Sequence, residues 1–181
     1  GMMEYTPVPV DILSSFEGWN ESFLAAARKK HIHFSFDKMA DTDYHTLADV
    51  EKLERIYFNL LSNAFKFTPE NGKVSISVSD TNDSWKVIIK DTGIGIPASE
   101  QSKLFKLHFR ASNAINSKVT GSGIGLMLVG KLVSLHGGKI SVDSVEHQGT
   151  TIKIVFPKKN KTSQSISDLS LIHISEPTRL A

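Results

Sequence analysis

The stretch Glu54-Arg-Ile-Tyr-Phe-Asn-Leu-Leu-Ser-Asn-Ala-Phe-Lys-Phe-Thr-Pro69 decides the fold of this chain. Asn59, Asn63 and Lys66 fall four and three residues apart, which places them in one stripe of a helix. Asparagine is unfavourable inside a helix, so this stripe indicates a metal and phosphate site, with a solvated polar edge as the alternative. Beside it, the apolar residues recur at helical spacing and predict one face packed on a core: Leu53, Ile56, Tyr57, Leu60, Leu61 and Ala64.

Length and composition predict one soluble domain followed by a tail. The chain has 181 residues, of which 40% are hydrophobic, and this is enough for one core. A formal charge of +2 argues against nucleic acid or an anionic membrane as a partner. The absence of cysteine excludes disulfides and thiolate zinc sites. No apolar run is long enough to span a bilayer, and no signal peptide opens the sequence.

Hydrophobic periodicity and turn residues predict an alternation of strands and helices. The expected helices run from a Ser14 cap to Lys30, over 50–67, briefly near 100–105, and over 123–136. The expected strands are 8–12, 32–36, 46–48, 74–78, 85–90, 139–145 and 150–156, with 85–90 apolar enough to be central. Between Ile96 and Thr120 the pattern is irregular, and the small polar segment 111–118 is typical of a mobile lid.

Three further motifs follow the asparagine helix in a fixed order. They are Asp91-Thr-Gly-Ile-Gly-Ile-Pro97, Leu104-Phe-Lys-Leu-His-Phe-Arg110 and Gly121-Ser-Gly-Ile-Gly-Leu126. Together the four motifs resemble the asparagine, glycine and phenylalanine boxes of the ATP-binding catalytic domain of bacterial sensor histidine kinases. The resemblance covers roughly Val8 to Pro157 and implies the α/β (α+β) Bergerat fold of that superfamily. This fold is a two-layer sandwich in which helices cover one face of a mixed sheet.

The resemblance implies an adenine pocket around Asp91, whose carboxylate would accept a hydrogen bond from the exocyclic amine. A tight turn is the alternative for this Asp-Thr-Gly sequence. Gly93 and Gly95 would let the backbone approach the purine and take positive φ. Phe67 would line the pocket or equally pack in the core. Ile96, Leu126 and Thr150 complete the expected nucleotide contacts, although Thr150 lies in the weakest motif and could belong simply to a turn and strand.

The same resemblance implies a Mg²⁺ and triphosphate site. Asn63 would coordinate Mg²⁺ through its amide oxygen, with Asn59 near the metal or its waters. Lys66 would reach a phosphate, and Arg110 would suit the γ-phosphate. Phe105 and Phe109 would anchor the lid. The glycine motif before the last helix offers free N–H groups to phosphates, through Gly121, Ser122, Gly123 and Gly125.

Asn59 distinguishes phosphoryl transfer from hydrolysis. Hydrolytic members of the superfamily carry a glutamate at this place, which activates water, whereas an amide cannot take a proton. We therefore expect catalysis by positioning and charge neutralisation, with Asn59, Lys66 and Arg110 as the catalytic residues. A hydrolytic ATPase, a Ser/Thr kinase of the same superfamily and a non-catalytic nucleotide-binding module are the alternatives.

The phosphate acceptor is expected on another domain. None of the seven histidines is followed by the acidic residue of a phospho-accepting site. The expected partner is therefore the dimerisation and histidine-phosphotransfer domain of a larger cytoplasmic or membrane-anchored parent kinase, with a response regulator downstream.

The two ends of the sequence carry no expected function. Residues 1–7 read as a tag scar and leader, because Gly1 precedes Met2. Residues 158–181 are expected to be a disordered tail. Within it, the segment 169–179 resembles the translation of a sequencing-library adapter, with an amphipathic tail as the alternative.

Overall fold

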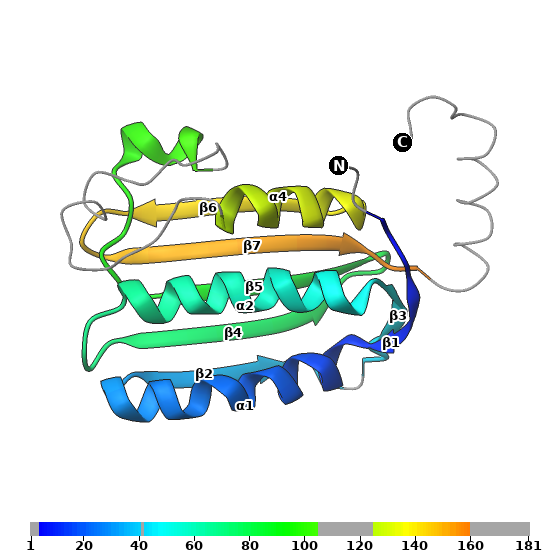
Figure 1. Ribbon diagram of the computed structural model, residues 1–181, viewed down its shortest axis with the longest axis horizontal. Coiled ribbons are helices and arrows are strands. Elements are labelled where there is room, and N and C mark those ends of the chain that lie inside the picture. Colours follow the sequence, from blue (N-terminus) through cyan, green and yellow to red (C-terminus); the bar gives the residue numbers. More distant parts are fainter. Residues whose placement is uncertain (1–3, 41, 105–124, 160–181) are drawn as a thin grey trace.

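The computed structural model describes residues 4–40, 42–104 and 125–159, which form a mixed sheet with helices on one face (Figure 1). The five-stranded sheet has the order β2-β4-β5-β7-β6, while β1 and β3 form a separate antiparallel ribbon. Within this sheet β2 and β4 run parallel, and the other neighbouring strands that the structure describes are antiparallel. The strands are β1 (Val8–Asp11), β2 (His33–Lys38), β3 (His45–Ala48), β4 (Lys73–Asp80), β5 (Ser84–Asp91), β6 (Lys139–Val145) and β7 (Gly149–Pro157).

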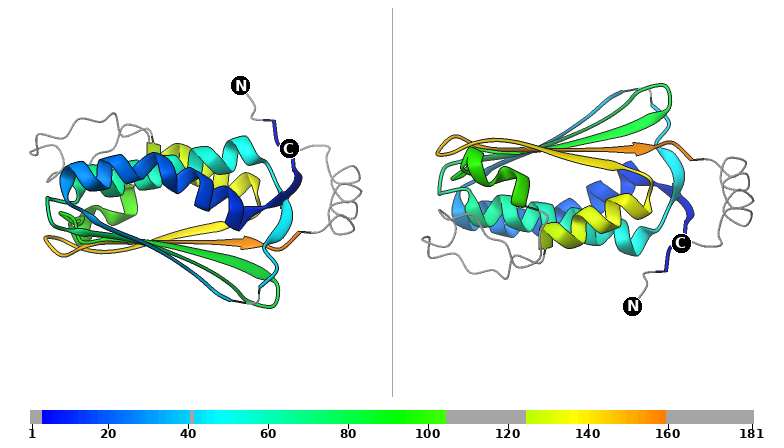
Figure 2. Two further views of the ribbon diagram at one scale, coloured as in Figure 1. Left: turned by 90° about the horizontal axis from the view of Figure 1, so that it is seen from below. Right: turned by 90° about the horizontal axis from the view of Figure 1, so that it is seen from above.

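The α-helices of the described ranges cover a single face of this sheet, as Figure 2 shows. They are α1 (Ile12–Lys30), α2 (Val50–Phe67) and α4 (Gly125–Leu135), and a 3₁₀ helix, η1 (Ala98–Lys103), follows β5. The predicted two-layer sandwich is confirmed, and β5 occupies the predicted central place. Among the described helices, none has the combination of length and apolar character that crossing a bilayer requires.

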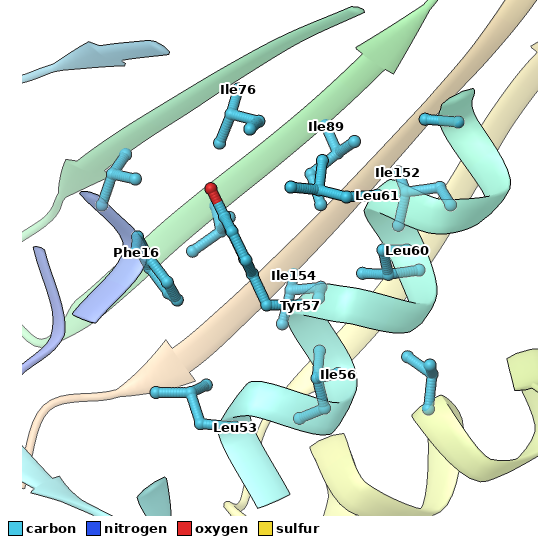
Figure 3. Close-up of a cluster of buried hydrophobic side chains, with 14 of the residues drawn as sticks. Phe16, Leu53, Ile56, Tyr57, Leu60, Leu61, Ile76, Ile89, Ile152 and Ile154 are labelled. Carbon is cyan, nitrogen blue, oxygen red and sulfur yellow. The ribbon is translucent and has the colours of Figure 1, made fainter. Parts of the chain in front are cut away.

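The asparagine helix α2 has the bounds that the sequence predicts, Val50–Phe67. It ends where Thr68 turns to extended backbone (φ −91°, ψ 124°), because the residue before a proline disfavours the helical conformation. Figure 3 shows its apolar side chains pointing into the core towards Ile76, Ile89, Ile152 and Ile154. All six predicted core residues are buried, together with Phe65.

The strand register arranges the covered face of the sheet in cross-strand rows. Residues directly opposite each other in antiparallel strands share a face, so each row crosses β4, β5, β7 and β6. Two rows are wholly apolar, whereas the third becomes polar. The rows are Val78–Val87–Ile154–Ile140, Ile76–Ile89–Ile152–Val142 and Val74–Asp91–Thr150–Ser144.

Helix α1 begins three residues earlier than predicted, and its cap is Asp11, not Ser14. The Asp11 carboxylate accepts hydrogen bonds from the backbone N–H groups of Leu13 (3.0 Å) and Ser14 (3.1 Å). Ser14 itself lies exposed within the first turn. Both residue types favour caps, and here the carboxylate at the end of β1 takes that place.

Asp49 caps α2 and joins it to two distant segments. Its carboxylate accepts from the N–H groups of Lys52 (3.3 Å) and Thr6 (2.8 Å) and pairs with the Lys52 ammonium at 3.2 Å. Its own N–H donates to His136 Nε2 at 3.2 Å, while His136 Nδ1 donates to the Leu132 carbonyl at 2.9 Å. Burial lowers the pKa of His136, which is consistent with this neutral, structural imidazole.

The fold extends past the predicted limits at Val8 and Pro157. Thr6 is held by Asp49, and the Lys159 carbonyl accepts from the Leu47 N–H at 3.0 Å. Thr46 exchanges two further hydrogen bonds with the Lys159 backbone, at 2.9 and 3.0 Å. Residues 160–181 lie outside the described part of the chain, so the expectation for the tail stays a prediction.

We expect Asp49→Ala to lower the free energy of unfolding by about 2–3 kcal/mol, because it removes a helix cap and leaves the Lys52 ammonium and the Thr6 N–H without their partner. The matched control is Asp11→Ala at the cap of α1, which should cost only about 1 kcal/mol. Urea denaturation of both variants measures the difference. Equal losses would mean that the additional contacts of Asp49 contribute nothing.

Candidate functional site

The polar stripe of α2 borders its buried face, as predicted. Asn59 and Asn63 are half-buried and Lys66 is exposed. Asn59 Nδ2 donates to the Arg55 carbonyl at 2.7 Å, which leaves the amide oxygen of Asn59 unused by this bond. Within the described residues, the Asn63 side chain has no hydrogen-bond partner. The Asn63 amide oxygen is thus available to a ligand.

The last turn of α2 meets the first glycine motif. The carbonyl of Phe67, which is itself half-buried, accepts from the Ile94 N–H at 3.2 Å. Lys30 Nζ donates to the carbonyls of Phe65 (2.8 Å) and Lys66 (3.1 Å), which satisfies two acceptors that a helix end leaves open. The Ile94 bond thus holds the glycine loop against the end of the asparagine helix, and the Lys30 bonds tie the end of α1 to the same turn.

Asp91 ends β5 beside this junction as a half-buried carboxylate. Its Oδ1 accepts from the Gly93 N–H at 2.8 Å, and the Thr150 N–H also bonds to the carboxylate. Burial raises the pKa of Asp91 to about 6, although these two hydrogen bonds act in the opposite direction. None of the ion pairs among the described residues includes Asp91. The carboxylate therefore keeps acceptor capacity, and no cation among the described residues compensates its charge.

The two glycines of the motif act differently. Gly95 has a φ of +68°, as predicted, and a Cβ there would lie 2.1 Å from the Val145 carbonyl oxygen. For Gly93 the prediction of positive φ is wrong. Instead, a Cβ on Gly93 would lie 2.6 Å from the Phe67 carbonyl oxygen and 2.8 Å from Asp91 Oδ1. Close packing at the end of α2, and not backbone handedness, requires glycine at position 93.

The β6–β7 hairpin holds the glycine loop from the other side, which the sequence did not reveal. The His147 N–H donates to the Ile94 carbonyl at 2.7 Å, and the Ile96 N–H donates to Ser144 Oγ at 2.9 Å. Gln101 Nε2 reaches both the Ile96 carbonyl (3.1 Å) and the Ser144 carbonyl (2.7 Å). Ser144 could have been noticed as the one polar residue in the apolar alternation Ile140, Val142, Ser144.

The remaining predicted residues are only partly placed. Arg110, Gly121, Ser122 and Gly123, together with Phe105 and Phe109, lie outside the described residues. The same holds for the expected lid. Gly125 is the first described residue of α4, and Leu126 is partly buried against the core. The structure thus brings the asparagine helix, the first glycine motif and the last motif together, and describes only Gly125 and Leu126 of the second glycine motif.

The opposite end of the sheet has a different character. A pocket there is lined mostly by apolar side chains, among them Ile12, Phe16, Trp85 and Phe156. No group of three or more His, Asp or Glu side chains able to hold a metal occurs in the part of the chain that the structure describes. Among the described side chains of α2, Asn63 offers an amide oxygen of the kind that binds a hard cation.

The raised pKa of Asp91 predicts a specific dependence of stability on pH. The folded-state pKa of about 6 lies above the ordinary 3.8, so folding binds a proton between these values. The free energy of unfolding should then fall as the pH rises through that window. Asp91→Asn, which still accepts from Gly93, should remove this fall and be more stable than the wild type by about 1–3 kcal/mol near pH 7.

Denaturant titrations at several pH values between about 4 and 7 measure this difference. Asp143→Asn, which changes an exposed carboxylate on β6, is the control and should run parallel to the wild type. A constant offset between Asp91→Asn and the wild type across this range would contradict the prediction.

Known proteins resemble this chain in sequence and in fold. The sensor histidine kinase WalK of Bacillus subtilis is 35% identical over 136 residues, which are 74% of this chain and 22% of WalK. The chain thus spans about a fifth of the length of that relative. The solved catalytic domain of histidine kinase ThkA has a TM-score of 0.73 and 28% identity, and the likeness covers 87% of this chain and 100% of that one.

A further solved structure contains a nucleotide analogue. Full-length ShkA in complex with AMPPNP has a TM-score of 0.76 and 25% identity, covering 88% of this chain and 33% of ShkA. The family model of histidine kinase-, DNA gyrase B-, and HSP90-like ATPases matches residues 48–160, which is more than half of the chain. The chain therefore belongs to this ATPase family, as the catalytic domain of sensor histidine kinases.

Proposed function

We propose that this domain binds Mg-ATP and donates the γ-phosphate to a histidine on the dimerisation domain of its parent kinase. The observation that carries the proposal is the meeting of α2, the Asp91 turn and the β6–β7 hairpin at one end of the sheet. Three separate motifs of a nucleotide-binding family converge there. The AMPPNP in the ShkA complex supports nucleotide binding in a relative of the same fold.

Asp91 suits recognition of adenine. It is a half-buried carboxylate with no cationic partner in the described ranges, so it accepts hydrogen bonds and gains most from a ligand donor such as the exocyclic amine. Gly93 leaves no side chain between Asp91 and the end of α2, and Phe67 is only half-buried there. Ile96, Leu126 and Thr150 would complete the contacts of the base pocket.

Asn63 suits Mg²⁺, because its amide oxygen is a hard ligand with no partner among the described residues. A bound Mg²⁺ would neutralise charge on the phosphates. Lys66 is exposed on the same stripe and would contact a phosphate. The family resemblance assigns the remaining phosphate contacts to Arg110, Gly121, Ser122, Gly123 and Gly125. Asn59 would lie close to the metal or to its waters.

Asn59 favours transfer over hydrolysis. Its amide has no basic site for a proton, and its Nδ2 is already engaged with the Arg55 carbonyl. Water near the γ-phosphate would thus lack a base on this stretch of α2. Transfer to a nucleophilic imidazole needs no such base. Positioning of the reactants and neutralisation of the phosphate charge would account for most of the rate acceleration. We place this reaction in the cytoplasm, with a response regulator as the later acceptor.

A labelling experiment tests the proposal. The chain is incubated with γ-labelled Mg-ATP, alone and with the separate dimerisation domain of its parent. We expect neither label on this chain nor phosphate release at an enzymatic rate, and we expect label on the histidine of the added domain. Stable label on this chain, or rapid phosphate release when it is alone, would contradict the proposal and favour a hydrolytic or other kinase activity.

The metal assignment predicts a selective loss. Asn63→Ala should weaken binding of ATP in Mg²⁺ by about ten-fold or more, because one hard-oxygen ligand is lost, and should leave the weaker binding in chelator unchanged. Asn82→Ala, in the turn between β4 and β5, is the matched control. Calorimetric titrations with and without Mg²⁺ measure both. An unchanged Mg²⁺ dependence in Asn63→Ala would refute the assignment.

A further inference from the structure

The polar row of the sheet links Asp91 to two hydroxyl groups. Asp91 lies directly opposite Thr150, and Thr150 lies directly opposite Ser144. All three therefore lie on the helix-covered face, where the neighbouring row consists of Ile89, Ile152 and Val142. Ser144 is buried, with 9% of its surface exposed, whereas Thr150 is half-buried and closer to the surface.

The hydrogen bonds of Ser144 determine where each proton lies. The Gly149 carbonyl can only accept, so the Ser144 hydroxyl donates its one proton there at 2.8 Å. The Ile96 N–H can only donate, so Ser144 Oγ accepts it at 2.9 Å. Thr150 Oγ1 lies 2.9 Å from Ser144 Oγ. Because the proton of Ser144 is already used, Thr150 must be the donor in this contact.

Thr150 therefore has no proton left for a ligand. Its hydroxyl retains lone pairs and can only accept a further hydrogen bond. The Thr150 N–H bonds to the Asp91 carboxylate, so this donor is engaged as well. The two side chains at this end of the sheet, Asp91 and Thr150, thus both present acceptors.

We propose that Ser144 is a specificity-determining positioning residue, which fixes the Thr150 hydroxyl as an acceptor and so favours a base with an exocyclic amine over one with a carbonyl. The inference rests on the proposed function, because it concerns the base of the nucleotide bound beside Asp91. A carbonyl at the position of the amine would face acceptors only, and an unpaired buried acceptor is unfavourable. Without Ser144, the Thr150 hydroxyl is free to turn and donate to such a carbonyl.

The test compares ATP with inosine triphosphate, which carries a carbonyl in place of the adenine amine. Calorimetry on the whole chain in Mg²⁺ gives the affinity ratio of the two nucleotides. Ser144→Ala should reduce the preference for ATP by about ten-fold, the size of one re-oriented hydrogen bond. Ser144→Thr, which keeps a hydroxyl, should retain the preference. Ser141→Ala, an exposed serine on the same strand, should change nothing.

A role of Ser144 in folding alone would weaken both nucleotides by the same factor, and that result would overturn the inference. Thr150→Ala provides the second route should Ser144→Ala not fold. It should reduce the preference by a similar factor, while Thr150→Ser should retain it. An unchanged ratio in Thr150→Ala would also overturn the inference. A wild-type chain that binds neither nucleotide would instead refute the proposed function, and the inference with it.

Discussion

The packing of α2 across the centre of the sheet is the constraint on which the rest of the structure depends. Seven side chains of this helix are buried, and burial of each large apolar side chain contributes about 1.5–3 kcal/mol. Figure 3 shows that they meet the isoleucines of β4, β5 and β7. This packing fixes the rotation of the helix, so the stripe of Asn59, Asn63 and Lys66 must border the core. It also places the end of the helix, which the Thr68-Pro69 sequence sets, beside Asp91.

The two ends of the sheet serve different purposes. At one end, Trp85 is buried among apolar side chains. There Asp49 bonds to His136, which follows α4, and to Thr6 in the N-terminal segment, so that it joins α2 to both. At the other end, the same face turns polar at Asp91, Thr150 and Ser144. Asp91 carries a charge whose burial opposes folding, as its raised pKa shows. A group that is unfavourable for stability and well placed for a ligand is typical of a functional site.

Much of this arrangement could be predicted from the sequence, since it depends on local patterns. The apolar period and the Thr68-Pro69 stop predicted both bounds of α2, and the ordered motifs predicted the family and fold. The prediction of the α1 cap was wrong because two residues that favour caps, Asp11 and Ser14, lie within one turn of each other. The prediction of a positive φ at Gly93 was wrong. The need for glycine there comes from close packing on the Phe67 carbonyl, which is distant in sequence.

The role of Ser144 could not be predicted for a similar reason. It depends on register, because only the pairing of β6 with β7 and of β7 with β5 places Ser144, Thr150 and Asp91 in one row. The role of Gln101 likewise depends on a contact distant in sequence, because its amide bonds to the carbonyls of both Ile96 and Ser144. Patterns along the chain identify faces and ends of elements, whereas contacts between strands determine which polar groups meet.

An NMR titration of the chain with Mg²⁺ and a non-hydrolysable ATP analogue, following the backbone amides, locates the nucleotide directly. We expect the largest shift changes at Gly93, Ile94 and Thr150 and at the end of α2 around Asn63. The amides of Asp49 and His136, at the opposite end of the sheet, should change little. Changes centred on the pocket beside Trp85 and His136, with none at Gly93 and Thr150, would contradict the claim that the nucleotide binds where α2 meets the Asp91 turn.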